Sequence, residues 1–152
     1  MSSPNATKTI AVDFDGTLVE NAYPAIGKPM LFAFETLKKL QEKGFLLILW
    51  TYRSGTQLEE AVAFCEKKGI EFYAVNKSYP EEEMSTKISR KIHADLFIDD
   101  RNIGGLMGWG EIYQLLIGTE GQPATVTLKK TKKKKPGHRL LEKFNALFED
   151  DE

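Results

Sequence analysis

Apolar and polar positions form blocks of two kinds along the chain. Residues 9–12 and 45–50 are mostly continuous apolar runs, typical of strands buried on both faces of a parallel sheet. Residues 70–75 and 95–98 predict two shorter strands. In other segments, apolar side chains recur at helical spacing. The predicted helices are residues 29–43, 57–68 and 109–117.

The order strand–helix–strand–helix–strand–loop–strand predicts an α/β fold. We expect a three-layer α/β/α sandwich with a mainly parallel, Rossmann-like sheet. Residues 85–93 are ambiguous between a helical turn and a loop. No stretch between the strands is long enough for a second folded domain, so the sequence predicts no large cap over the sheet.

Charged side chains follow the first predicted strand directly. Asp13 and Asp15 are two residues apart, so on an extended chain they would share a face, and Gly16 then lets the chain turn away. In open α/β sheets, ligands bind outside the carboxyl ends of the strands. Two acids there indicate a divalent-metal site, a nucleophile with an acid/base partner, or both. The simpler alternative is that the two acids only form a turn.

Other strand ends carry matching chemistry. Thr51 follows the second strand, Asp99 and Asp100 follow the last, and Lys91 lies just before it. Acids, a hydroxyl and a lysine are the groups that phosphoryl transfer through a carboxylate requires. The carboxylate attacks phosphorus, a metal ion offsets charge repulsion, and the hydroxyl and ammonium groups hold the phosphoryl oxygens.

These motifs, in this order, resemble those of the haloacid dehalogenase superfamily of phosphatases. The run Asp-Phe-Asp-Gly-Thr at residues 13–17 matches its first motif, Thr51 the second, Lys91 the third, and Asp99-Asp100 the fourth. Residues 91–105 are also similar to a group of compact bacterial hydrolases. The resemblance covers about three-quarters of the chain and implies a catalytic domain over residues 1–118.

The resemblance also implies a role for each residue. Asp13 would be the nucleophile and a Mg²⁺ ligand, and Asp15 the general acid/base and a ligand through its backbone carbonyl. Thr51 and Lys91 would bind the transferring phosphoryl group. Asp99 would ligate the metal directly, whereas Asp100 would act through water or hold the lysine. Oxygen ligands, few in number, suit Mg²⁺.

Several assignments have alternatives. Thr51 is also explained as a residue that ends a strand by bonding to the backbone. Lys91 competes with Lys87 and Arg90 for the cationic role. Arg53 is placed to reach a phosphate, but an exposed salt bridge explains it equally well.

Composition sets the remaining bounds. The chain has 152 residues and a net charge of −1, so nothing global indicates nucleic acid or membrane binding. Its single cysteine, Cys65, lies on an apolar helical stripe, which predicts a packed thiol. Residues 1–7 are polar and do not resemble a signal peptide, and no run is long enough to span a bilayer, so we expect a cytoplasmic protein.

Residues 119–152 differ in character from the rest. They contain a run of lysines, then a segment with apolar residues at helical spacing, and an acidic end. We expect a basic, partly helical C-terminal tail. The alternative is a basic patch that attracts phosphates or nucleic acid, although lysines without interleaved aromatic residues bind weakly and without sequence readout.

The sequence therefore predicts a Mg²⁺-dependent phosphomonoesterase acting on a small or macromolecular phosphoester. One alternative is a nucleotide or nucleic-acid-end phosphatase. A non-enzymatic alternative is a phospho-accepting signalling module of the receiver type, in which the acidic pair comes first in the chain rather than last. The sequence leaves the substrate and the oligomeric state open.

Overall fold

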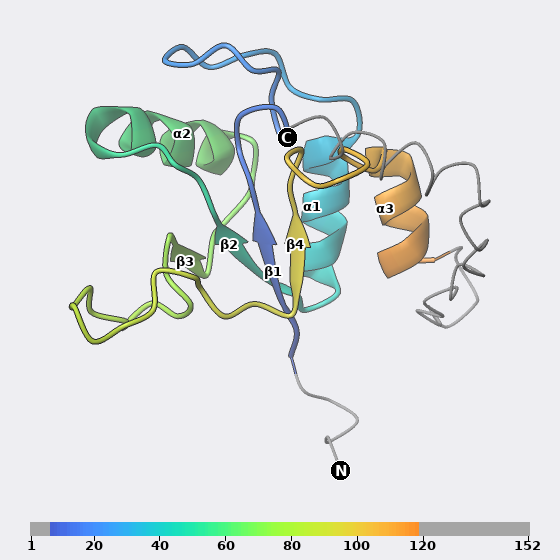
Figure 1. Cartoon of the computed structure of the whole chain (residues 1–152). Helices are drawn as coiled ribbons and strands as arrows, with labels where there is room; N and C mark the ends of the chain where they lie inside the picture. The colour runs from blue at the N-terminus through green and yellow to red at the C-terminus, as the bar shows by residue number, and fades with distance from the viewer. Residues whose placement is uncertain (1–6, 119–152) are drawn as a thin grey trace, which may run out of the picture.

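A parallel four-stranded sheet forms the centre of the protein, which we describe from a computed structural model over residues 7–118 (Figure 1). The strands are β1 (Thr9–Val12), β2 (Leu46–Leu49), β3 (Ala74–Val75) and β4 (Leu96–Ile98), in the spatial order β3-β2-β1-β4. The helices are α1 (Ala33–Glu42), α2 (Gly55–Lys67) and α3 (Trp109–Leu116). The predicted α/β fold with a parallel sheet and no large cap is confirmed.

Both faces of the two central strands are buried, as their apolar runs predict. In β1, the side chains of Ile10 and Val12 belong to one hydrophobic cluster, whereas Ala11 belongs to a second. In β2, Leu47 and Leu49 face the first cluster and Ile48 the second. This alternation follows from the period of two along a strand.

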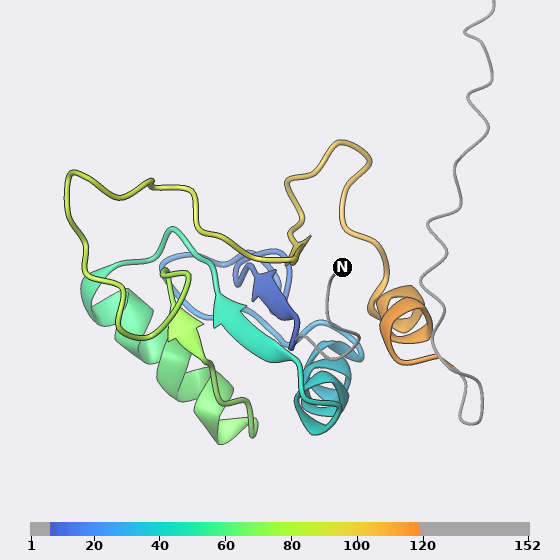
Figure 2. The same cartoon turned by 90° about the horizontal axis from the view of Figure 1, so that it is seen from below.

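All three helices pack on the same face of the sheet. Buried apolar side chains from each of them belong to the first cluster, including Leu37 of α1, Cys65 of α2 and Trp109 of α3. Figure 2 shows the helices together on one side of the strands. The apolar stripe predicted for α1 accounts for its packing, because Phe34, Leu37 and Leu40 are all buried.

The chain between β3 and β4 covers the other face (Figure 2). It contributes the buried side chain of Ile92, with Ala94 packed nearby, to the cluster around Ala11 and Ile48. This chain contains no helix, so the segment 85–93 is a loop, and within the described residues the layer on this face is not helical. Connections between parallel strands are right-handed. The β1–β2 and β2–β3 connections cross the sheet in one direction and the β3–β4 connection crosses it in the other, so we expect the third connection on the opposite face from the first two.

The third strand is shorter than predicted. Only Ala74–Val75 pairs with β2, although the Tyr73 N–H also donates a hydrogen bond to the Leu47 carbonyl. Within residues 7–118, all three helices are too short to span a bilayer. The predicted basic tail, residues 119–152, lies outside the described residues.

Candidate metal centre and adjoining pocket

The carboxyl ends of β1 and β4 lie side by side at the point where the strand order reverses. From β1 the chain continues to β2 on one side, whereas β4 pairs with β1 on the other. Val12 is in register with Ile98, and the Asp13 N–H donates a 3.0 Å hydrogen bond to the Ile98 carbonyl. Such a switch point is where α/β sheets bind ligands. Asp13 after β1 and Asp99 after β4 therefore emerge at the same place.

Three carboxylates converge there. One oxygen from each of Asp13, Asp99 and Asp100 lies within 4.8 Å of the other two, and all three residues are half-buried. Like charges this close disfavour the ionised forms unless a cation accompanies them. The carboxylates of Asp13 and Asp99 are thus close enough to hold a common metal ion, which the role expected for them from the sequence requires.

Asp100 supplies an independent sign that the cluster fits a cation. Its Oδ1 atom is buried and has no hydrogen-bond partner among residues 7–118. A buried carboxylate oxygen without a partner is costly, and a metal ion would satisfy it. The cluster is made of oxygen ligands alone, which suits a hard divalent cation such as Mg²⁺.

Gly16 makes room for this arrangement. Its backbone is left-handed, with φ of +83°, and a Cβ atom built at this position would collide with the Asp100 carboxylate. Glycine is therefore required both by the turn after β1 and by the close approach of the β4 end.

Thr17 joins the two strand ends. Its hydroxyl donates a 2.8 Å hydrogen bond to Asp13 Oδ2 and accepts a 3.1 Å hydrogen bond from the Asp100 N–H. Its carbonyl accepts a 2.8 Å hydrogen bond from the Trp109 indole N–H, and its side chain is fully buried. Trp109 therefore anchors α3 to the turn that carries the acids.

The protein raises the pKa of Asp13 to about 7. Burial of the carboxyl is the largest cause, and the charges of Asp99 and Asp100 add to it, whereas the hydrogen bond from Thr17 acts in the opposite direction. A bound divalent cation would reverse this balance, because it favours the ionised carboxylate.

An open pocket of about 500 Å³ adjoins the carboxylates. Its lining residues come from the ends of β1, β2 and β4, and are Asp13, Trp50, Thr51, Tyr52, Asp99 and Arg101. The Trp50 N–H donates a 2.9 Å hydrogen bond to the Val12 carbonyl, which places the end of β2 beside Asp13. The structure therefore brings Thr51 together with the acids, as the sequence motifs predict.

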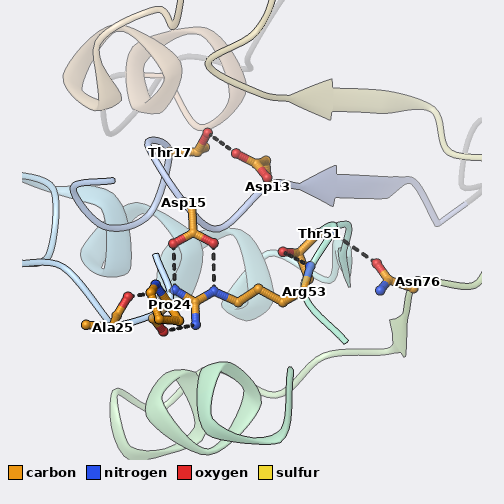
Figure 3. A network of polar contacts seen from close by, with 8 residues as sticks. All are labelled: Asp13, Asp15, Thr17, Pro24, Ala25, Thr51, Arg53 and Asn76. Carbon is orange, nitrogen blue, oxygen red and sulfur yellow. Dashed lines mark hydrogen bonds and ion pairs between the residues drawn. The ribbon is translucent and has the colours of Figure 1, made fainter. Parts of the chain in front are cut away.

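Thr51 is held in place by its neighbours (Figure 3). Its N–H donates a 2.8 Å hydrogen bond to Asn76 Oδ1, and its hydroxyl accepts a 3.2 Å hydrogen bond from the Arg53 N–H. Asn76 has a left-handed backbone, with φ of +53°, a conformation that asparagine adopts more readily than most residues. The Thr51 hydroxyl therefore does bond to the backbone, as the alternative interpretation of this residue proposes, and Thr51 also lines the pocket.

Asp15 and Arg53 form a separate network next to the pocket. Arg53 Nε and Nη2 donate 2.7 Å hydrogen bonds to the two oxygens of Asp15. The Asp15 carboxylate points toward Arg53, whereas Asp13 points toward Thr17 (Figure 3). The two acids therefore do not share a face, because β1 ends at Val12 and the chain has already turned at Asp15.

Arg53 does not occupy the position predicted for it. The residue is only 1% exposed, and its guanidinium binds Asp15 and two backbone carbonyls instead of lining the pocket. It is therefore neither free to bind phosphate nor part of an exposed salt bridge. A buried arginine with matched partners fits a structural or positioning role better.

Lys91 lies in the loop between β3 and β4, with an exposed side chain. It is not among the residues that line the pocket, so its predicted contact with a phosphoryl group remains a prediction. Lys87 and Arg90 are exposed in the same loop.

Sequence reasoning did not assign roles to four residues that the structure places at the site. These residues are Thr17, Trp50, Tyr52 and Arg101. Thr17 is the last residue of the first motif, and the other three directly adjoin a predicted motif in the chain; this position in the chain was the only available signal. Their contributions depend on side-chain directions after the strands end, which the apolar pattern does not encode.

Fold and site together define a small α/β protein with a carboxylate cluster at the switch point of a parallel sheet. Its structure is similar to that of a conserved protein from Bacteroides thetaiotaomicron, with a TM-score of 0.69 and 55% sequence identity over 74% of this chain and 91% of that one. The two chains therefore belong to one protein family. No protein-family model matches the chain, and no curated protein matches it. The resemblance to haloacid dehalogenase phosphatases thus stays a prediction.

Proposed function

We propose that the protein is a Mg²⁺-dependent phosphomonoesterase that works through an aspartyl-phosphate on Asp13. The convergence of Asp13, Asp99 and Asp100 within 4.8 Å, beside a pocket that also contains Thr51, carries the proposal. Mg²⁺ held by these carboxylates would offset the repulsion between Asp13 and the anionic substrate.

The first step transfers the phosphoryl group to the protein. A carboxylate oxygen of Asp13 attacks phosphorus and the bond from phosphorus to the ester oxygen breaks. Asp15, which must enter this step protonated, gives its proton to the ester oxygen and is left as a carboxylate. Thr17 holds Asp13 Oδ2 during the attack through its 2.8 Å hydrogen bond. The Thr51 hydroxyl, at the pocket wall, stabilises the phosphoryl oxygens.

The second step frees the nucleophile. Water attacks phosphorus, Asp15 accepts a proton from it, and the bond between phosphorus and the Asp13 oxygen breaks to release inorganic phosphate. The pocket is open, which agrees with hydrolysis, because water must enter as the second nucleophile.

Phosphate release from p-nitrophenyl phosphate, measured with Mg²⁺ and with EDTA, tests the proposal. We expect Mg²⁺-dependent turnover that Asp13→Asn abolishes and that Asp99→Asn shifts to higher Mg²⁺ concentrations. Asp95→Asn is the matched control, because Asp95 lies just before β4, at the opposite end from the cluster, and bonds to Thr9. Unchanged turnover in Asp13→Asn would overturn the mechanism.

A nucleotide phosphatase is the second candidate, and the pocket lining favours it. Trp50 and Tyr52 offer aromatic rings beside the acids, Tyr52 is 72% exposed, and Arg101 adds a positive charge. An aromatic ring binds a nucleobase by stacking, which contributes roughly 1–3 kcal/mol per base in single-stranded nucleic-acid complexes.

Comparing nucleoside 5′-monophosphates with ribose 5-phosphate separates the two candidates. If the rings bind the base, Tyr52→Ala should lower kcat/KM about 10-fold for the nucleotides and little for the sugar phosphate. Equal effects on both substrates would remove the nucleotide alternative.

The cytoplasmic location expected from the sequence also remains a prediction.

A further inference from the structure

We propose that Arg53 is the positioning residue for Asp15, holding the general acid/base of the reaction in place. The inference rests on the proposed function, because it assigns Arg53 a task in that reaction. Neither Arg53 nor Asp15 is among the residues that line the pocket, and Arg53 would act on the reaction only through Asp15.

The contact between the two side chains is a two-point clamp. Nε and Nη2 of Arg53 each donate a 2.7 Å hydrogen bond to a different oxygen of Asp15 (Figure 3). Paired parallel bonds of this kind fix both the position and the plane of a carboxylate. The Asp15 side chain is only 8% exposed, so water competes little for these bonds.

Arg53 is itself held from several directions. Its Nη1 and Nη2 atoms donate to the carbonyls of Pro24 and Ala25 at 3.0 and 2.8 Å. The guanidinium carbon lies 5.0 Å from the ring centre of Phe14 and 5.2 Å from that of Tyr23, within range for cation–π attraction. A buried cation is costly unless partners offset the loss of water. Asp15 and the carbonyls of Pro24 and Ala25 together accept hydrogen bonds from four of the five N–H groups of the guanidinium.

The clamp connects three segments that border the site. Asp15 belongs to the turn after β1, the two carbonyls belong to the loop before α1, and Arg53 follows β2. The Arg53 N–H also bonds to the Thr51 hydroxyl, so one residue links Asp15 to the wall of the pocket. Lysine has no planar fork and cannot reproduce this set of bonds.

The test compares leaving groups. Loss of general acid catalysis matters for an alkyl phosphate, whose leaving oxygen needs a proton, and matters little for p-nitrophenyl phosphate, whose leaving group departs as a stable anion. The parameter kcat/KM reports the first phosphoryl transfer, in which the leaving group departs. We therefore expect Arg53→Gln to lower kcat/KM about 100-fold for an alkyl phosphate and less than 10-fold for the aryl phosphate, as Asp15→Asn should.

Three further variants complete the design. Arg53→Lys keeps a buried cation if the glutamine variant fails to fold, and it should show the same leaving-group pattern. The double variant Asp15→Asn/Arg53→Gln should be no worse than Asp15→Asn alone, because both substitutions remove the same function. Lys43→Gln, which replaces an exposed cation at the end of α1, is the control and should leave the turnover of both substrates unaffected.

The outcomes separate this inference from the proposed function. If the wild-type protein with Mg²⁺ hydrolyses neither substrate, the proposed function fails and this inference fails with it. If the wild-type protein is active but both Arg53 variants lose the same factor on both substrates, or if the double variant loses the product of the single effects, only the positioning role of Arg53 is overturned.

Discussion

The hydroxyl of Thr17 donates a 2.8 Å hydrogen bond to Asp13 Oδ2. The same hydroxyl accepts a hydrogen bond from the Asp100 N–H, so a single buried oxygen atom connects the ends of β1 and β4. The position of the nucleophile proposed here thus depends on a residue that does not line the pocket.

Replacing Thr17 by valine should weaken both stability and catalysis. The change preserves shape but leaves the Asp100 N–H and the Asp13 carboxylate without their partner, which typically costs about 1–3 kcal/mol. Urea unfolding would measure the stability loss, and phosphate release the activity. Thr17→Ser should retain most of both. Thr36→Val is the matched control, because Thr36 is equally buried but lies in α1; similar losses in Thr36→Val and Thr17→Val would contradict the role of the hydroxyl.

Replacing Gly16 by alanine should disrupt the carboxylate cluster of Asp13, Asp99 and Asp100. The new Cβ would collide with the Asp100 carboxylate, in addition to the strain of a positive φ, which costs about 1–3 kcal/mol. Gly44→Ala carries the same strain, with φ of +87°, but its Cβ would meet nothing within 4 Å. Calorimetric titration with Mg²⁺ should therefore show weaker binding for Gly16→Ala and unchanged binding for Gly44→Ala. Equal Mg²⁺ affinity in the two variants would contradict this account.

The raised pKa of Asp13 predicts a pH-dependent stability when no divalent ion is added. Burial lifts its pKa to about 7 from an ordinary value of 3.8, so between these values the folded state holds a proton that the unfolded state has lost. Stability from this group is present at acidic pH and is lost as the pH rises through about 7. In EDTA, the fall in Tm from pH 5 to pH 8 should be larger for the wild-type protein than for Asp13→Asn. The opposite order would show that the carboxyl is not destabilised by its surroundings.

The buried thiol of Cys65 should not react in the folded protein. Its side chain is fully buried in the main hydrophobic cluster, and burial raises its pKa to about 12. A thiol-specific reagent at pH 8 should label it only after denaturant is added, since the thiolate is the reactive form. Rapid labelling in native buffer would contradict the packed position that the helical pattern predicted.

Local periodicity in the sequence is enough to locate several of the helices and strands. The apolar runs located β1 and β2, and the spacing of Phe34, Leu37 and Leu40 located the buried face of α1. The sequence also determined that Asp13, Thr51 and Asp99 would meet, because each follows a strand, and parallel strands end at a common edge of their sheet.

Only the folded chain shows where Asp15, Arg53 and Thr17 lie and what they contact. Arg53 forms its hydrogen bonds to Asp15 although the two residues are 38 positions apart in the chain. Thr17 and Asp100, which are also joined by a hydrogen bond, are 83 positions apart. The folded chain also shows that a loop, not a helix, covers the second face around Ala11. A repeating apolar pattern records which side of its own helix or strand is buried. The contacts of Asp15, Arg53 and Thr17 depend on how segments far apart in the chain are placed in the fold, and a local pattern does not contain that information.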